Sequence, residues 1–302
     1  KALKSVRGFE NVKFFRPGYA IEYDYFPPTQ LSNTLETKLI KNLFFAGQIN
    51  GTTGYEEAAA QGLIAGINAN LKHNEDSPFV LGREEAYIGV LIDDLILKGT
   101  EEPYRMFTSR AEYRTLLRQD NADERLTGKS NALGLASDER LIKLEEKLKK
   151  RSDLVSYLRK TSFPLSKANQ LLFKKNDPPL KQTDKYSKLL SRPKITRKDL
   201  LTFKSLKNYV IDQKMSDSIF EQAEIEIKYS GYIEKEKRSA SKLKRLENIK
   251  IPANLDFDKL VSLSTEAREK LNKLRPSTLA QASRISGISP SDISVLLVTM
   301  GR

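Results

Sequence analysis

Hydrophobic and polar residues alternate in the first part of the chain and recur at helical spacing in the rest. Alternation over 12–15 and 20–25 is typical of strands, and the apolar run 43–46 predicts a third strand. An apolar stripe at helical spacing over 83–98 predicts a helix, which Gly99 would end. The first part of the chain therefore has the pattern of a mixed α/β region.

From about residue 126 the pattern is helical throughout. We expect one helix over 137–159, a short one over 196–200 and the longest over 216–247. Residues 162–193 contain four prolines and are predicted to be irregular. Four residues of the longest helix fall near one of its faces: Ile219, Ala223, Ile227 and Tyr232.

The C-terminal segment 257–300 is expected to form three short helices, divided at Pro276 and at 287–290. The last two helices, with a tight turn between them, have the outline of a helix-turn-helix. Reading DNA needs side chains directed at the bases, and mainly Ser283 and Arg284 are on offer. A surface that docks a protein partner or tRNA is therefore the preferred interpretation.

These patterns divide the chain into a mixed α/β domain, 1–125, and an all-α domain, 126–302, whose last subdomain covers about 257–302. The second domain holds 37 basic and 21 acidic residues, a balance of +16, whereas the whole chain carries +13. Charge of this size favours a polyanionic partner such as a nucleic acid. A generally lysine-rich composition is the alternative explanation.

Composition also narrows the classes of function. No stretch approaches eighteen consecutive apolar residues, so we expect no membrane-spanning segment. The chain has no cysteine, which excludes disulfides and thiolate metal sites. The single histidine, His73, lies in a polar stretch, and we therefore expect no metal site formed by the protein.

The most informative segment is a glycine-rich turn between the third predicted strand and a helix that starts near residue 55. Gly47, Gly51 and Gly54 let the backbone adopt positive φ and approach a ligand closely. Acidic residues in the first helical turn would repel a diphosphate. The free amides and the Gln48 side chain suit instead a carbonyl-bearing ring such as the pyrimidine edge of a flavin. A tight corner without a ligand is the alternative.

An arginine cluster follows in the acidic stretch before residue 126. Its four members are Arg105, Arg110, Arg114 and Arg118. If Ser109 caps a helix, the last three share one face, where forked guanidiniums suit phosphates. The neighbouring Tyr104 and Tyr113 could stack an unpaired base. The alternative is pairing with the nearby acidic residues, which are Glu112, Asp120, Asp123 and Glu124.

Longer strings of the chain resemble one known family. The gapless stretch 46–58 reads AGQINGTTGYEEA, and 103–114 reads PYRMFTSRAEYR. Further matching segments are 16–24, 61–62, 65–69, 120–123 and 281–288. From end to end, the chain resembles the MnmG/GidA family of flavin-dependent enzymes, which modify the wobble uridine of certain tRNAs.

The resemblance implies that 1–125 is the remainder of an FAD-binding, Rossmann-like domain and that the all-α domain binds tRNA and a partner. It implies FAD as cofactor, with NADH and a folate one-carbon donor serving the full-length enzyme. That enzyme would add a carboxymethylaminomethyl-type group to C5 of the wobble uridine, together with an MnmE-type GTPase engaged by the C-terminal tail. The implied cofactor contacts are Gly47, Gln48, Asn50, Gly51, Thr53, Gly54 and Tyr55. The implied tRNA contacts are Arg105, Arg110, Arg114 and Arg118, and Tyr19 and Tyr25 could line the pocket.

The chain lacks two features of that family, the Gly-x-Gly-x-x-Gly turn and the cysteines thought to act as nucleophiles. We therefore expect it to be the C-terminal part of a longer polypeptide, without catalytic residues of its own and inactive alone. A cytoplasmic homodimer is expected for the parent. The alternatives are a non-catalytic module that binds RNA or docks a partner, and a flavoprotein of another oxidoreductase class with an added basic domain.

Overall fold

The computed structural model describes residues 1–302 except 17, 19–21, 101, 248 and 302. The N-terminal region contains helices α1 (Tyr55–His73) and α2 (Tyr87–Lys98), joined by irregular segments. Seven residues from these helices and the loop before α1 form its largest apolar cluster: Leu31, Leu35, Ile64, Ala65, Ile92, Ile96 and Leu97. Gly99 ends α2 with φ +69°, as predicted.

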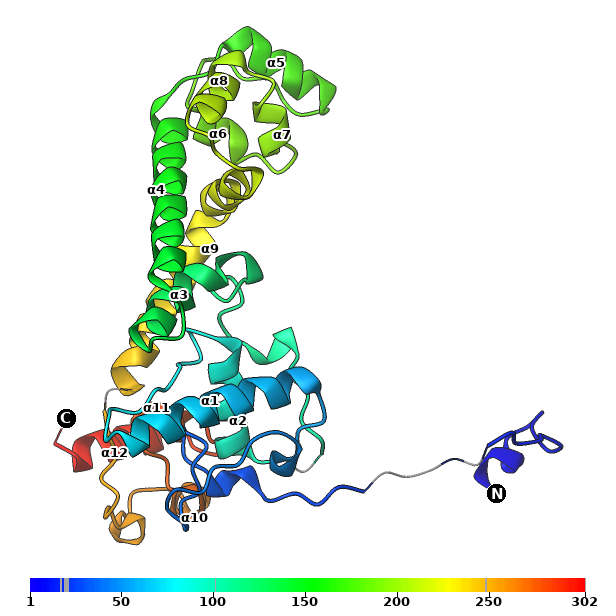
Figure 1. Ribbon diagram of the computed structural model, residues 1–302, viewed down its shortest axis with the longest axis vertical. Coiled ribbons are helices and arrows are strands. Elements are labelled where there is room, and N and C mark those ends of the chain that lie inside the picture. Colours follow the sequence, from blue (N-terminus) through cyan, green and yellow to red (C-terminus); the bar gives the residue numbers. More distant parts are fainter. Residues whose placement is uncertain (17, 19–21, 101, 248, 302) are drawn as a thin grey trace.

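No strand occurs among the described residues of this region, so the prediction of strands at 12–15 and 43–46 is wrong there. The prediction for 20–25 lies partly outside the described residues. Isolated bridges, such as Glu36 to Phe44 and Thr52 to Tyr104, are the only sheet-like pairings among the described residues. A strand is stable only when a neighbour pairs with its backbone. The first residues instead extend away from the rest of the chain, with Phe15 fully exposed (Figure 1).

The predicted helix at 83–98 begins four residues late, at Tyr87. The segment before it forms a turn, in which the amides of Glu85 and Ala86 both donate to the carbonyl of Gly82. This turn packs tightly on the helix, because a Cβ at Gly89 would lie 2.3 Å from the Gly82 oxygen. The turn places Arg83 beside α2 instead of within it.

The remainder of the described chain is helical, as predicted for an all-α C-terminal part. Its helices are α3 (Ala122–Ala132), α4 (Asp138–Lys160), α5 (Leu165–Lys174), α6 (Tyr186–Leu190), α7 (Arg197–Leu200), α8 (Lys204–Asp212), α9 (Asp217–Glu247), α10 (Thr265–Leu274), α11 (Leu279–Arg284) and α12 (Pro290–Thr299). The predictions of α4, α7, α9 and the three tail helices are confirmed.

The prediction that 162–193 is irregular is wrong, because α5 and α6 lie within it. Its four prolines lie outside the helices, where they do not disturb the helical hydrogen bonds. Pro164 is the N-cap of α5, and Ala168 and Leu172 bury the inner face of that helix. Apolar spacing between the prolines was therefore the better signal.

Helices α4 and α9 pack against each other and carry the smaller helices α5 to α8 at one end (Figure 1). Ile219, Ala223 and Ile227 are buried in the apolar cluster formed there. Tyr232 does not share their face, since its side chain is 68% exposed. Five residues after Ile227, it points about 140° away on a helix of 3.6 residues per turn. After Ile227, α9 leaves the apolar cluster and continues toward α11.

Candidate functional site

The glycine-rich turn is fixed from behind by one buried side chain of α1. The Gln61 Oε1 atom accepts from the Gly47 amide at 3.1 Å and from Asn50 Nδ2 at 2.7 Å. Gln61 Nε2 donates to Thr52 Oγ1 at 3.0 Å, and the Thr52 hydroxyl donates to the Gly47 carbonyl at 2.9 Å. The backbone needs glycine here, because φ is +88° at Gly47 and +76° at Gly51. The turn therefore has one defined shape.

A cavity of about 220 Å³ opens on the turn. Its lining is Tyr23, Tyr25, Gln48, Gly51, Thr52, Thr53, Thr100, Glu102 and Pro103. Three predicted cofactor contacts, Gln48, Gly51 and Thr53, are thus brought together with Tyr25. Tyr19 lies outside the described residues.

The other four predicted cofactor contacts do not line this cavity. Gly47 and Asn50 stand behind the turn, bonded to Gln61. Gly54 is buried, and a Cβ there would lie 1.7 Å from Glu57 Oε2. Tyr55 is 93% exposed at the start of α1. Gly47, Asn50 and Gly54 therefore shape the turn, and Tyr55 flanks it.

Thr100 stands out among the lining residues. Its Oγ1 atom is buried and has no hydrogen-bond partner among the described residues. A Cβ added to Gly51 would lie 2.5 Å from this oxygen, so the hydroxyl lies directly against the turn. A buried hydroxyl without a partner is unfavourable unless a ligand or water satisfies it. Thr100 is therefore a candidate ligand contact.

Glu57 connects the turn with the segment 105–118, hereafter the arginine loop. This carboxylate is buried in the first turn of α1, where the positive end of the helix dipole favours it. Its Oε1 atom accepts from the Met106 amide at 2.7 Å and lies 3.6 Å from Arg105 Nε. The cavity and the arginine loop are consequently adjacent.

The arginine loop is not a helix, so Ser109 does not cap one and the condition for a shared arginine face is not met. A 3₁₀ helix covers only Thr108–Arg110, and irregular chain follows to a second 3₁₀ helix at Gln119–Asn121. The cause lies upstream, because the Arg83 side chain donates to the Arg110 carbonyl at 3.2 Å and to Glu112 at 2.7 Å. The first of these bonds occupies the Arg110 carbonyl, which a continuing helix would pair with the amide four residues later.

The four arginines therefore do not share a helical face. Arg105 and Arg114 are exposed, and the Arg110 guanidinium lies 4.2 Å from the centre of the Tyr104 ring. Arg118 pairs with Asp120 at 2.9 Å, which is the acidic pairing considered above. The other nearby carboxylates bind different cations, since Glu112 pairs with Arg83, Asp123 with Lys147 and Glu124 with Arg151.

Arg83 is the centre of a buried charge network on α2. Its guanidinium lies 2.8 Å from Asp94, 3.1 Å from Asp93 and 2.7 Å from Glu112. Burial alone would lower the pKa of Arg83, but the hydrogen bond to Glu112 and the aspartate charges raise it. Burial would likewise raise the pKa of Asp94, yet Lys98 and Arg83 hold it below its usual range. Burial and Asp94, which accepts the Tyr104 hydroxyl at 3.0 Å, raise the pKa of that phenol.

The C-terminal tail joins the same network through Arg284. This side chain donates twice to Asp93, both at 2.8 Å, and lies 2.7 Å from Glu247 at the end of α9. Arg284 is consequently largely buried, so it is not available to read DNA bases, which further disfavours the helix-turn-helix interpretation. Its partner on α2 could not be predicted, since no pattern within the tail signals Asp93.

Three family models match the chain. The model described as "Glucose inhibited division protein A" covers residues 1–77. The "tRNA modifying enzyme MnmG/GidA C-terminal helical domain" covers 138–237, and the corresponding "C-terminal helical bundle" covers 239–302. This chain belongs to the MnmG/GidA family.

Curated relatives of this MnmG/GidA chain include proteins from Christiangramia forsetii and Flavobacterium psychrophilum, both described as "tRNA uridine 5-carboxymethylaminomethyl modification enzyme MnmG". Each is 64% identical over 302 residues, which is 100% of this chain and 48% of the relative. The solved structure of Aquifex aeolicus GidA in its form II crystal is similar, with a TM-score of 0.80 and 43% identity. The match covers 99% of this chain and 47% of the Aquifex aeolicus chain. The MnmG/GidA chain thus spans about half the length of the relatives it matches.

Sequence reasoning missed several residues that this MnmG/GidA chain brings to the turn. Thr100, Glu102 and Pro103 come from the segment after α2, which the bridge from Thr52 to Tyr104 places beside the turn. Such a long-range pairing leaves no local pattern. Gln61 did leave one, because it is a polar residue within the otherwise small and apolar stretch 58–67 of α1.

In the part of the MnmG/GidA chain that the structure describes, no helix combines the length and the apolar character needed to cross a membrane. Among the same residues, no group of three or more histidine, aspartate or glutamate side chains is arranged to hold a metal ion.

Proposed function

We propose that this chain is the C-terminal part of an FAD-dependent enzyme that modifies the wobble uridine of certain tRNAs. With an MnmE-type GTPase, the full-length polypeptide would add a carboxymethylaminomethyl-type group to C5 of that base. The observation that carries the proposal is the adjacency of the cavity at Gln48, Gly51 and Thr53 to the arginine loop, through Glu57.

The residues at the cavity fit part of a flavin. The Gln48 amide offers a donor and an acceptor, and the Thr100 hydroxyl needs a partner. The rings of Tyr23 and Tyr25 provide apolar walls. Ligand pockets usually enclose about 300–1,000 Å³, so a cavity of about 220 Å³ suits one ring system of the dinucleotide. When bound, FAD would supply hydride transfer, with NADH as reductant and a folate as one-carbon donor.

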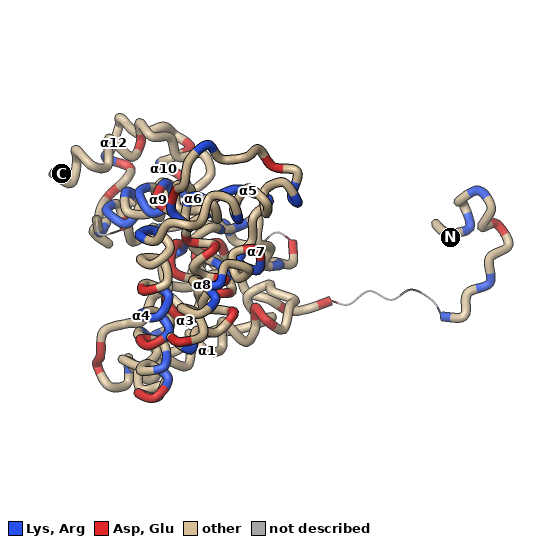
Figure 2. The backbone as a smooth tube through the Cα atoms, turned by 90° about the horizontal axis from the view of Figure 1, so that it is seen from above, with Lys and Arg blue, Asp and Glu red and all other residues tan. Residues whose placement is uncertain are grey.

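The chain's own residues would bind and orient the substrates. Arg105 is exposed beside the cavity, and Arg114 is exposed further along the arginine loop, and both could contact tRNA phosphates. The basic balance of 126–302 supports a polyanionic substrate, and Figure 2 shows Lys and Arg along α9. Engagement of the GTPase by the tail, a homodimer and a cytoplasmic location are part of the same proposal and rest on family resemblance.

A pair of glycine variants in the full-length polypeptide tests the cavity. Gly51→Ala places a Cβ 2.5 Å from Thr100 Oγ1 and strains a backbone at φ +76°, so flavin content should fall several-fold. Gly62→Ala is the matched control, because nothing lies within 4 Å of its Cβ and α1 tolerates alanine. Visible flavin absorbance and mass analysis of the wobble nucleoside would be measured for both, with circular dichroism to check folding.

Loss of flavin and of modification in Gly51→Ala, with both retained in Gly62→Ala, supports the proposal. A folded Gly51→Ala protein with full flavin content would contradict the cavity assignment. A wild-type full-length polypeptide that binds tRNA but carries no flavin would instead favour the non-catalytic RNA-binding module.

A further inference from the structure

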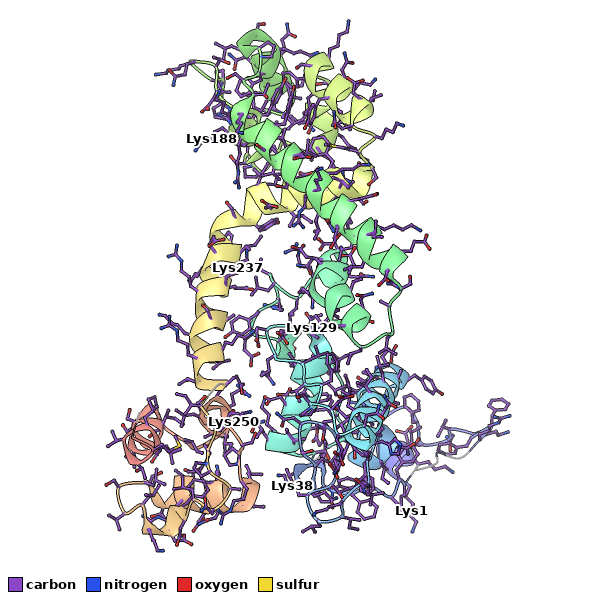
Figure 3. The ribbon with its side chains drawn as sticks, turned by 60° about the vertical axis from the view of Figure 1, so that its left-hand side comes forward. Lys1, Lys38, Lys129, Lys188, Lys237 and Lys250 are labelled. Atoms are coloured by element: carbon purple, nitrogen blue, oxygen red, sulfur yellow. The ribbon has the colours of Figure 1, made fainter. Side chains whose placement is uncertain are left out.

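Glu236 is an acidic residue in the most basic stretch of α9. Its neighbours Lys235, Lys237 and Arg238 are exposed, whereas Glu236 is half-buried. Ala240, one turn further along the helix, is buried, so this face of α9 is turned toward the protein. Figure 3 shows Lys237 on this part of the helix. The carboxylate of Glu236 is therefore directed differently from the charges around it.

The Glu236 carboxylate binds three donors of the arginine loop. Its Oε2 atom accepts from the Thr115 amide at 3.0 Å and the Leu116 amide at 3.2 Å, and Oε1 accepts from the Thr115 hydroxyl at 2.8 Å. Among the described residues, the Thr115 amide has no backbone partner, so Glu236 supplies its acceptor. The Leu116 amide also donates to the Tyr113 carbonyl at 3.0 Å, and Glu236 is its second acceptor. Hydrogen bonds to an ionised carboxylate are among the stronger ones in proteins. Glu236 thus serves this loop as a capping carboxylate serves a helix.

The Thr115 peptide is fixed from both of its sides. Glu236 accepts its amide proton, and Arg118 donates to its carbonyl oxygen at 2.6 Å. Arg114 directly precedes this residue, so its backbone inherits the constraint while its side chain remains exposed. Arg83, which binds the Arg110 carbonyl, restrains the loop further upstream.

We propose that Glu236 is a positioning residue that holds the arginine loop against α9, so that Arg114 and the exposed Lys235 and Lys237 form one cationic surface for tRNA. This inference rests on the proposed function, which supplies tRNA as the substrate. Glu236 touches no reacting atom. Its effect would pass through the backbone of the loop to Arg114.

The test uses Glu236→Ala and Glu236→Gln in the full-length polypeptide, with Glu234→Ala as the matched control. Glu234 lies on the same helix, is exposed and has Lys237 3.8 Å away. Hydrogen exchange of the 115–116 amides and the KM and kcat for tRNA modification would be measured. For Glu236→Ala we expect faster exchange and a KM for tRNA raised about tenfold at nearly constant kcat, as the loss of charged hydrogen bonds predicts. Glu236→Gln keeps one acceptor oxygen and should fall between that variant and wild type.

Glu234→Ala should leave the exchange at wild-type rates and should not raise the KM, because it removes only an acidic neighbour of Lys237. Unchanged exchange in Glu236→Ala would overturn the proposed contact. Faster exchange with an unchanged KM would overturn the positioning role, as would a fall confined to kcat. Arg114→Ala separates the two proposals. If it raises the KM for tRNA while Glu236→Ala does not, only the positioning role fails. If the wild-type polypeptide binds no tRNA, both proposals fail.

Discussion

Two regions of the molecule are held together in opposite ways. One is the apolar cluster between α4 and α9, and the other is the charge network of Arg83, Asp93, Asp94 and Arg284 around α2, hereafter the junction. In the cluster, large apolar side chains such as Leu158, Phe203 and Phe220 are almost completely buried. In the junction, the buried groups include Arg83 and Asp94, joined to one another at 2.8 Å. Apolar burial is non-directional and tolerates small shifts, whereas a buried ion pair is favourable only in one geometry.

The type of contact in each region depends on its distance from the candidate site. The cluster lies at the far end of α4 and α9, away from the turn that precedes α1 (Figure 1). The junction instead connects the arginine loop through Arg83 and the C-terminal tail through Arg284. Directional contacts therefore occur where the relative placement of loop, tail and turn would matter for binding. Variants that disturb each region separately can test this division.

The largest expected effect is in the cluster. Phe220→Ala removes a buried ring and should lower the free energy of unfolding by about 4 kcal/mol. Phe173→Ala, whose side chain is 83% exposed, is the control and should change it by less than about 0.5 kcal/mol. Denaturant unfolding followed by circular dichroism measures both. Equal losses in the two variants would show that this cluster is not the apolar core of the region.

An intermediate effect is expected at the junction. Arg284→Met removes two hydrogen bonds from the buried Asp93 carboxylate, which keeps its contact with Arg83, and should lower the free energy of unfolding by about 3 kcal/mol. Adding Asp93→Leu removes this incompletely compensated charge and should restore most of that loss. Denaturant unfolding of the two single variants and the double variant forms the cycle.

The pH dependence of Arg284→Met adds a second measurement. Burial already raises the pKa of Asp93, and Arg284 opposes that rise. Without Arg284 the folded state should bind a proton more readily than the unfolded state, so the stability deficit should shrink as the pH falls. Additive losses in the cycle, or a deficit that grows on acidification, would contradict a directional ion pair here.

Local signals in the sequence predicted much of the helical region. Ser137 caps α4, where its hydroxyl accepts from the Arg140 amide, and Thr196 caps α7. Caps and apolar spacing act within a few residues, so one sequence suffices to find them. Gln48 and Gly51, predicted from the glycine-rich turn, also lie together at the cavity with Thr53, which the family resemblance implied.

The remaining features depend on partners distant in the chain. The predicted strands would need a neighbouring strand, which the described residues do not provide. The arginine loop departs from a helix because Arg83, far upstream, binds the Arg110 carbonyl. Thr100 reaches the turn only because Thr52 pairs with Tyr104. The assignment of cofactor and tRNA contacts and the domain boundaries at 126 and 257 stay predictions.

The smallest effect is expected within the tail, where Asp292 combines features of both regions. This carboxylate accepts from the amides of Ser264 and Ser289, both at 2.9 Å, and so joins the first turns of α10 and α12 beside an apolar cluster. The Ser264 amide and the Ser289 hydroxyl lower its pKa from 3.8 to about 2. Asp292→Asn should lower the free energy of unfolding by about 1 kcal/mol at neutral pH.

Because the pKa of Asp292 is lower in the folded state than in the unfolded one, its stabilisation is present above about pH 4 and lost as the pH falls toward 2. Thermal unfolding between these pH values should therefore show a steeper acid loss for wild type than for Asp292→Asn. Asp212→Asn, at an exposed carboxylate ending α8, is the control and should keep the wild-type slope. Parallel pH curves for wild type and Asp292→Asn would mean that the carboxylate does not couple the two helix starts. The tail would then be stabilised in the same way as the cluster between α4 and α9, by burial of apolar side chains without directional contacts.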